Sequence, residues 1–208
     1  MTKFISEIAS AHTGKISLIK KISNLHCGSN SNFLKLQIFK TKNLFQKSNK
    51  KYINFKKLEI SFKSWIKIIN QYKNKTKIIL EPFDNESYKF CKKFKNQVYI
   101  KVSSSESDNI ELILDALTNF KKVFINLSGM DLSDIKKILF FLKKKKLKKR
   151  VILMYGFQAY PTKARDLRFG LFRYFKKLGF DYGYADHSTY GINNEVVDVC
   201  AFAKKKLN

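Results

Sequence analysis

Short apolar runs alternate with amphipathic segments along the whole chain. The runs are rich in β-branched and aromatic residues and short enough for buried strands, and they occupy 4–8, 33–39, 77–80, 98–102, 123–127, 151–155 and 182–185. Between them, apolar residues recur at helical spacing, most clearly in 110–117, 135–142 and 167–178. This alternation of strand and helix predicts a parallel sheet that is wrapped by helices.

The number of strand and helix units favours a closed barrel over an open sheet. About seven units fit before a last helical segment at 194–206, one short of the eight in a (β/α)₈ barrel. No GxGxxG or GxxxxGK(S/T) phosphate loop follows the first strand, which argues against the dinucleotide-binding and P-loop classes. We therefore predict an α/β protein, a (β/α) TIM-type barrel with about seven of its eight units, as one domain over residues 1–208 that is incomplete at its C-terminus. The polar segment 41–62 is predicted to be a long loop after the second strand.

The chain is strongly basic, with 42 Lys and Arg against 16 Asp and Glu and a formal net charge of +26. Such a charge attracts polyanions, including nucleic acid, anionic lipid and phosphorylated metabolites. However, the charge is spread over many predicted helices, and the aromatic residues lie mainly in apolar stripes. The basic run 143–150 closes an amphipathic helix, where cations favour the helix dipole. We therefore expect no nucleic-acid partner.

Cysteine usage and hydropathy indicate the cellular setting. Cys27, Cys91 and Cys200 are widely spaced and odd in number, which predicts neither a disulfide framework nor a metal knuckle and favours the reducing cytoplasm. The N-terminus lacks an apolar signal region, and no stretch approaches the roughly 20 apolar residues of a membrane span. We expect a soluble protein with no membrane partner.

Polar side chains gather at the predicted C-terminal ends of the strands, where barrel enzymes build their active sites. They are Glu7, His12, Lys35, Gln37, Lys101, Ser104, Glu106, Ser128, Gln158, Tyr160, Asp186 and His187. Lys35 and Lys101 lie within apolar strands, where an unpaired ammonium group is costly to bury. Each either holds a bound phosphate or carboxylate, points outward, or forms a structural ion pair with Glu7 or Glu106. The presence of both lysines in one ring favours the ligand.

Two of the histidines differ in their position along the predicted elements. His26 lies in a loop at a helix end and is predicted to be structural, as most lone histidines are. His187 directly follows Asp186 at a strand end, where a neutral imidazole can hold a divalent metal ion. We therefore predict His187 as a metal ligand.

Eight short blocks carry a more specific pattern. They are 7–14 (EIASAHTG), 35–40 (KLQIFK), 59–62 (EISF), 81–84 (EPFD), 101–106 (KVSSSE), 128–130 (SGM), 159–162 (AYPT) and 183–187 (GYADH). In this order and spacing they resemble the successive strand-end motifs of the N-acetylneuraminate (sialic acid) synthase family, over essentially the whole chain. Each block alone is weak, but chance is a poor explanation for so many in the correct order.

The resemblance implies a metal-dependent transferase of carbohydrate biosynthesis. In its reaction, phosphoenolpyruvate attacks the open-chain aldehyde of an N-acetylmannosamine-type amino sugar, water adds, and phosphate leaves to give a nonulosonic (sialic-type) acid. By the same resemblance the catalytic residues are Glu106, which handles the proton of the attacking water, and Glu7. The implied substrate-binding residues are Lys35, Gln37, Lys101, Ser104, Ser128, Gln158, Tyr160 and Asp186. His187 would hold Mn²⁺ or Mg²⁺ as a Lewis acid for the aldehyde oxygen.

The chain also departs from the family pattern. Family-typical residues are replaced at Ala11, Glu81, Ser105, Leu127 and Ala185, and Glu81 puts an anion where a phosphate is expected. The family's second metal histidine and its antifreeze-like C-terminal domain would lie beyond the last residue of this chain. We therefore expect residues 1–208 alone to show little turnover. The alternative function is a degenerate or incomplete barrel that binds a sugar or phosphate ligand without turnover. For its assembly, a homodimer and completion by a separate C-terminal polypeptide both stay open.

Overall fold

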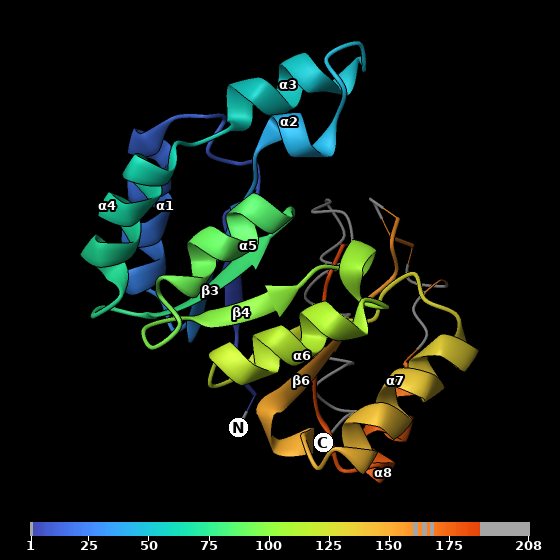
Figure 1. Ribbon diagram of the computed structural model, residues 1–208. Helices are drawn as coiled ribbons and strands as arrows, with labels where there is room; N and C mark the ends of the chain where they lie inside the picture. The colour runs from blue at the N-terminus through green and yellow to red at the C-terminus, as the bar shows by residue number, and fades with distance from the viewer. Residues whose placement is uncertain (1, 160–161, 164–165, 167–168, 188–208) are drawn as a thin grey trace. The chain divides into compact units, whose positions relative to one another are not determined.

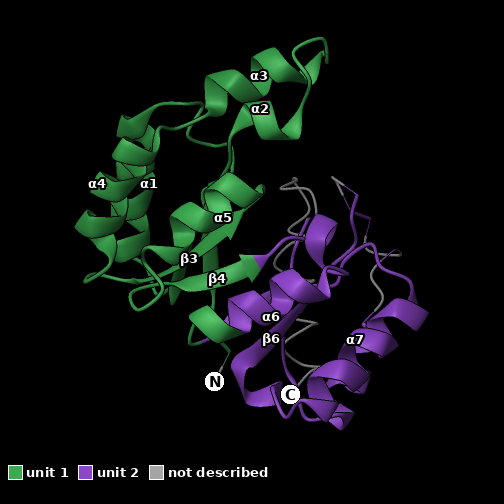
Figure 2. Ribbon diagram, in the orientation of Figure 1, with its two compact units in different colours: residues 1–101, 118–121 green, residues 102–117, 122–208 purple. Residues whose placement is uncertain are grey.

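The computed structural model describes residues 2–159, 162–163, 166 and 169–187. The chain divides into two compact units, one of residues 1–101 and 118–121 and the other of residues 102–117 and 122–208 (Figure 2). The single domain expected over residues 1–208 stays a prediction. The helix expected at 194–206 lies outside the described residues.

Seven strands in the described residues occupy the predicted positions, with each end shifted by no more than two residues. They are β1 (Ile5–Glu7), β2 (Phe33–Ile38), β3 (Lys77–Pro82), β4 (Tyr99–Val102), β5 (Val123–Asn126), β6 (Val151–Tyr155) and β7 (Asp181–Tyr184). The strand prediction is therefore confirmed.

Helices follow or connect the strands, as the alternating pattern predicts. They are α1 (Ile16–Cys27), α2 (Thr41–Leu44), α3 (Lys51–Leu58), α4 (Phe62–Tyr72), α5 (Asn85–Lys92), α6 (Ile110–Asn119), α7 (Leu132–Lys144) and α8 (Gly170–Lys177), with 3₁₀ turns η1 (Ser104–Glu106) and η2 (Lys148–Arg150). Across the described ranges, no helix has the length and apolar character needed to cross a membrane.

In the first unit, strands β1 to β4 pair in parallel and in chain order. Because successive side chains of a strand point to opposite faces, every second residue belongs to the same face of this sheet. One face carries the fully buried apolar residues Leu34, Leu36, Ile38, Ile78, Leu80 and Ile100. Helix α5 packs against β3, and α1 packs against α4 (Figure 1). The other face carries the charged residues that are described below.

The prediction of a long loop at 41–62 is wrong. This segment contains α2 and α3, which lie against each other, and it ends where α4 begins. Phe55 of α3 packs on Phe39 and Phe45, with ring centroids 5.6 and 4.7 Å away. Aromatic contacts therefore hold helical structure in a segment whose Lys- and Asn-rich composition is typical of a loop.

In the second unit, strands β5, β6 and β7 also pair in parallel and in chain order. The predicted apolar stripe of α7 is confirmed by its buried residues, Ile135, Ile138, Leu139 and Leu142. The buried residues of α8 are Phe172 and Phe175, which lie within the predicted helical segment 167–178. Both units thus build their helices around apolar faces, as parallel sheets require.

Candidate active site

One face of the first unit's sheet carries charged and amide side chains at the strand ends. Glu7, Lys35, Gln37, Glu81 and Lys101 are named the strand-end cluster. Lys35 Nζ lies 2.7 Å from Glu7 Oε2 and 2.9 Å from Glu81 Oε2. Lys101 Nζ lies 2.7 Å from Glu81 Oε1. Gln37 Nε2 donates to Glu7 Oε1 at 2.8 Å and to Glu81 Oε2 at 3.3 Å. The Glu81 carboxylate is thus shared by both lysines.

The parallel register explains why these side chains meet. Lys35 pairs in register with Ile79, so Glu81, two residues further along β3, lies on the same face. Tyr99 also pairs with Ile79, which places Lys101 on this face as well. Alternation and register therefore bring two lysines and one carboxylate together from three neighbouring strands.

Burial and pairing set the ionisation of the strand-end cluster. The side chains of Lys35, Lys101 and Glu81 are 8%, 8% and 4% exposed, whereas that of Glu7 is 37% exposed. Burial alone would raise the pKa of Glu81, but the charges of Lys101 and Lys35 outweigh it and lower that pKa to about 2. Burial would lower the pKa of Lys35, yet Glu81 and Glu7 raise it above its usual range. The pKa of Lys101 is lowered by burial, which together with repulsion from Lys35 outweighs the attraction of Glu81.

The cluster decides between some of the alternatives for the buried lysines. The outward-pointing alternative is excluded because both lysines lie on the face of the sheet opposite the apolar one, and the ion pair between Lys35 and Glu7 is confirmed. For Lys101 the partner observed on the neighbouring strand is Glu81, in place of the expected Glu7 or Glu106. The sequence interpretation gave Glu81 no pairing role, although strand alternation was the signal that could have placed it on this face.

His12 closes the turn after β1. Its Nδ1 accepts a hydrogen bond from the Gly14 N–H at 3.0 Å, and its ring lies edge-on to that of Trp65. Burial lowers the pKa of His12, which favours the neutral ring. Gly14 has a φ of +78°, and a Cβ at this position would lie 2.0 Å from the backbone oxygen of Lys57. The turn therefore requires glycine.

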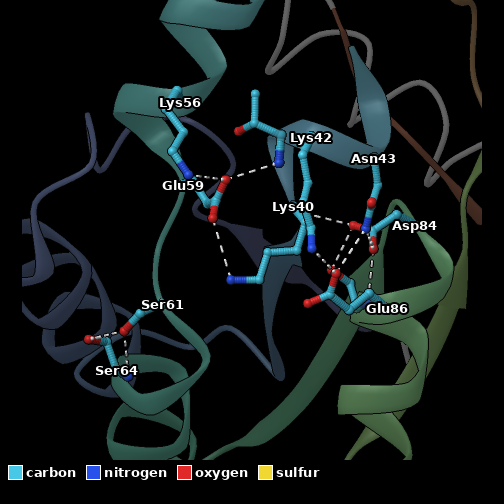
Figure 3. Close-up of polar contacts among 11 residues, drawn as sticks. Lys40, Lys42, Asn43, Lys56, Glu59, Ser61, Ser64, Asp84 and Glu86 are labelled. Atoms are coloured by element: carbon cyan, nitrogen blue, oxygen red, sulfur yellow. Dashed lines mark hydrogen bonds and ion pairs between the residues drawn. The ribbon is translucent and has the colours of Figure 1, made fainter. Parts of the chain in front are cut away.

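Glu59 ties together the connection between β2 and α4 (Figure 3). Its carboxylate accepts from the Thr41 N–H at 3.0 Å and from the ammonium groups of Lys40 and Lys56, at 3.4 and 3.2 Å. Burial would raise the pKa of Glu59, but these bonds outweigh it and lower that pKa. Glu59 thereby fixes the start of α2 to the segment that leads into α4.

Asp84 caps α5 and anchors the residues after β2 (Figure 3). Its carboxylate accepts from the Ser87 N–H at 2.9 Å, from the Lys40 N–H at 2.8 Å and from Asn43 Nδ2 at 3.0 Å. Burial would raise the pKa of Asp84, but these bonds outweigh it and lower that pKa. Sequence reasoning included Asp84 in a motif block without giving it a role, although an Asp directly before a helix is a known N-cap signal.

Replacing Asp84 with alanine should lower the free energy of unfolding by about 2 kcal/mol, because α5 loses its N-cap and three further donors, the Lys40 N–H, Asn43 Nδ2 and Ser87 Oγ, lose an acceptor. Urea unfolding followed by circular dichroism measures this loss. The matched control is Glu86→Ala on the same helix, since Glu86 contacts only Lys42 and Asn43 among the bonds described for it and lies at the surface. Its unfolding midpoint should hardly move. Equal losses in the two variants would show that Asp84 is not the anchor.

In the second unit, the turn 156–158 after β6 bonds to three predicted site residues. The first is Ser128, which follows β5 and is buried. Its Oγ donates to Asn126 Oδ1 at 2.6 Å and accepts from the Gly156 N–H at 2.9 Å. The hydroxyl of Ser128 therefore links the end of β5 to the start of this turn.

Ser104 is the second predicted site residue that this turn contacts. Gln158 Nε2 donates to Ser104 Oγ at 2.8 Å, which leaves the hydroxyl proton of Ser104 available to another acceptor. Glu106, two residues further along η1, is half-buried and accepts from Asn109 Nδ2 at 3.1 Å. Three of the predicted polar residues thus lie on η1 and on the turn after β6.

His187 is the third predicted site residue that the turn contacts. Its Nδ1 lies 2.9 Å from the carbonyl oxygen of Phe157. Because a carbonyl oxygen only accepts, Nδ1 carries the proton. The lone pair of Nε2 can therefore serve as one ligand of a metal ion. Asp186 accepts from the Tyr184 hydroxyl at 3.0 Å, and Tyr160 lies outside the described residues. Within the part of the chain that the structure describes, no three His, Cys, Asp or Glu side chains are grouped to hold a metal ion.

Solved structures share this fold over nearly the whole chain. An N-acetylneuraminic acid (sialic acid) synthetase from Leptospira borgpetersenii serovar Hardjo-bovis, in complex with citrate, has a TM-score of 0.80 and 24% identity, covering 95% of this chain and 69% of that one. A putative spore coat polysaccharide biosynthesis protein E from Chromobacterium violaceum has a TM-score of 0.78 and 22% identity, covering 97% and 63%. The fold class is thus the predicted (β/α) TIM-type barrel, with seven strands in the described residues.

Sequence comparison identifies the family within this class. The model of the NeuB family matches residues 18–204, so this chain belongs to the NeuB family. The N,N'-diacetyllegionaminic acid synthase of Campylobacter jejuni subsp. jejuni serotype O:2 is 26% identical over 90% of this chain. The chain spans 61% of the length of that relative.

Proposed function

We propose that this chain forms the barrel of a synthase that condenses phosphoenolpyruvate with an N-acetylmannosamine-type aldehyde, giving a nonulosonic acid and phosphate. Membership of the NeuB family and similarity to a legionaminic acid synthase support this proposal. The observation that carries it is the pair of buried ammonium groups of Lys35 and Lys101. Lys101 is the residue before the last in β4, and Lys35 lies within β2 in register with Glu7, the last residue of β1. Barrel enzymes bind their substrates at the C-terminal ends of their strands.

Phosphoenolpyruvate carries a carboxylate and a phosphate, so two fixed cations would both bind and orient it. Lys35 and Lys101 already share one carboxylate, which shows that their Nζ atoms can contact the same small anionic group. Gln37 adds an amide donor in the same cluster. In the second unit, Ser104 keeps a hydroxyl proton for a substrate oxygen, and Ser128 positions the turn that carries Gln158.

The remaining groups would act on the aldehyde and on water. Glu106 would accept the proton of the attacking water, and Glu7, Asp186 and Tyr160 would contact the sugar. His187 Nε2 would hold Mn²⁺ or Mg²⁺, which supplies Lewis-acid polarisation of a carbonyl oxygen when it is bound. The bond between Nδ1 and the carbonyl oxygen of Phe157 fits this role because it fixes the ring and its tautomer.

A second candidate function is a barrel that binds a phosphate or sugar ligand without turnover. The observation that favours it is Glu81, whose carboxylate already neutralises the two lysines from within the chain. A ligand that must compete with this carboxylate would be held less tightly than one that enters a free cationic site.

Calorimetric titration with phosphoenolpyruvate tests both candidates. Lys35→Met should weaken phosphoenolpyruvate binding by about a hundredfold, because the ligand loses an ion pair with a buried ammonium group. Lys42→Met is the matched control, because Lys42 is 65% exposed and its ammonium group pairs with Glu86, outside the strand-end cluster. Sugar-dependent release of phosphate, in the presence of N-acetylmannosamine, Mn²⁺ and a C-terminal polypeptide that carries the eighth strand, separates a synthase from a binding protein. Absence of phosphoenolpyruvate binding by the unaltered chain would reject both candidates.

A further inference from the structure

Glu81 occupies the position in the strand-end cluster that a bound anion would take. Its two carboxylate oxygens lie 2.7 Å from Lys101 Nζ and 2.9 Å from Lys35 Nζ. The amide of Gln37 donates to it as well, at 3.3 Å. Two ammonium groups and one amide around a carboxylate form an anion-binding arrangement, and here the anion belongs to the chain itself.

We infer that Glu81 is an internal competitor for the anion subsite, so that a substrate carboxylate or phosphate binds by displacing it, and that Glu81 thereby determines which anions the site accepts. This inference rests on the proposed function only in identifying the subsite with the one for phosphoenolpyruvate. The formal charges support it, since Lys35 and Lys101 are balanced by Glu81 and Glu7. The strand-end cluster therefore has no excess positive charge to offer a ligand.

The charge balance also predicts selectivity. A singly charged anion that replaces the Glu81 carboxylate gains about the same interaction energy with the two lysines as that carboxylate had. It also leaves the buried Glu81 side chain without its partners. A phosphate or a compound with both phosphate and carboxylate brings more negative charge to Lys35 and Lys101, and its interaction is correspondingly stronger. Glu81 should therefore favour multiply charged anions over acetate-like ones.

Solvent access to the cluster makes displacement feasible. Lys35, Lys101 and Glu81 are buried, but Glu7 is 37% exposed and bonds directly to Lys35. The cluster thus reaches the surface at the strand ends. A buried ion pair that served stability alone gains little over an apolar replacement, so a role in binding explains the charges better.

Titration of the full chain with inorganic phosphate, phosphoenolpyruvate and acetate tests the inference. Glu81→Gln and Glu81→Thr remove the competing charge, and both should bind phosphate and phosphoenolpyruvate about tenfold more tightly than the unaltered chain. Both should also bind acetate, with less preference for the multiply charged anions. The matched control is Glu59→Gln, which removes a carboxylate of the same unit that pairs with Lys40 and Lys56. Anion affinity should be unchanged in this control.

Folding of the variants is followed in the same samples by circular dichroism. If a Glu81 variant is unstable without ligand, phosphate should raise its thermal midpoint more than it raises that of the unaltered chain. Equal or weaker anion binding by both folded variants, or no additional stabilisation by phosphate, overturns the inference. Tighter binding of inorganic phosphate by both variants, with no binding of phosphoenolpyruvate by the variants or the unaltered chain, would leave the inference standing and count against the synthase, so the two can fail separately.

Discussion

Replacing Gly14 with alanine should lower the free energy of unfolding by about 4 kcal/mol. The positive φ of +78° is unfavourable for a residue with a Cβ, and that Cβ would meet the backbone oxygen of Lys57 at 2.0 Å. A backbone atom cannot rotate away as a side chain can, so the turn after β1 and the end of α3 must move apart. Urea unfolding of both proteins at neutral pH measures the difference.

The matched control for this prediction is Gly28→Ala at the end of α1. Gly28 has a φ of −86°, and the nearest atom to an added Cβ lies 3.7 Å away. This replacement should change stability by less than about 1 kcal/mol, because neither strain nor overlap results. A similar loss at both positions would indicate a general sensitivity of α1 rather than the overlap at Gly14.

Acidification should lower the free energy of unfolding by about 3 kcal/mol through Glu81 alone. The pKa of Glu81 is about 2 in the folded chain and 4.5 for an ordinary Glu. Because the pKa of Glu81 is lower in the folded chain, its ionised carboxylate stabilises the fold fully at pH values above 4.5. This stabilisation is lost as the pH falls from 4.5 toward 2. Urea unfolding at a series of pH values between these limits should show this slope.

Glu81→Gln should flatten the acid limb, because the amide cannot titrate. The variant also leaves two buried lysines with less compensating negative charge, which changes the overall stability. The quantity to compare is therefore the slope of the free energy of unfolding against pH. Glu111→Gln on α6 is the control, because Glu111 is exposed and its removal should leave the slope as it is. If the Glu81 variant loses stability at acid pH as steeply as the unaltered chain, the lysines do not lower the pKa of this carboxylate.

Much of the fold could be predicted from the sequence because parallel strands and amphipathic helices have different periods. Runs such as 151–155 are apolar without interruption, and α7 repeats its apolar residues at helical spacing. The segment 41–62 escaped prediction because its helices bury few side chains and depend on contacts of Phe55 with residues distant in sequence. Local composition carries no information about such contacts.

The site was predictable in its positions and less so in its partners. Lys35 and Lys101 stand out because a charge in an apolar strand needs compensation, and the structure supplies it. The identity of the compensating group depends on which residues of neighbouring strands lie opposite each other. Glu81 was therefore visible as an anion in the sequence, but its contact with both lysines needed the register. The bond from Gly156 to Ser128 was hidden for the same reason.

The alternation of faces in β2 has a further consequence for the assembly of the sheet. If β2 slipped by one residue, Lys35 and Gln37 would enter the apolar face, while Leu34 and Leu36 would face the carboxylates of Glu7 and its neighbours. Lys35 and Gln37 would then be buried without partners and the carboxylates would lose theirs, so the slipped pairing is strongly disfavoured. The charges at the strand ends therefore act during folding as a check on strand alignment, before any ligand is present.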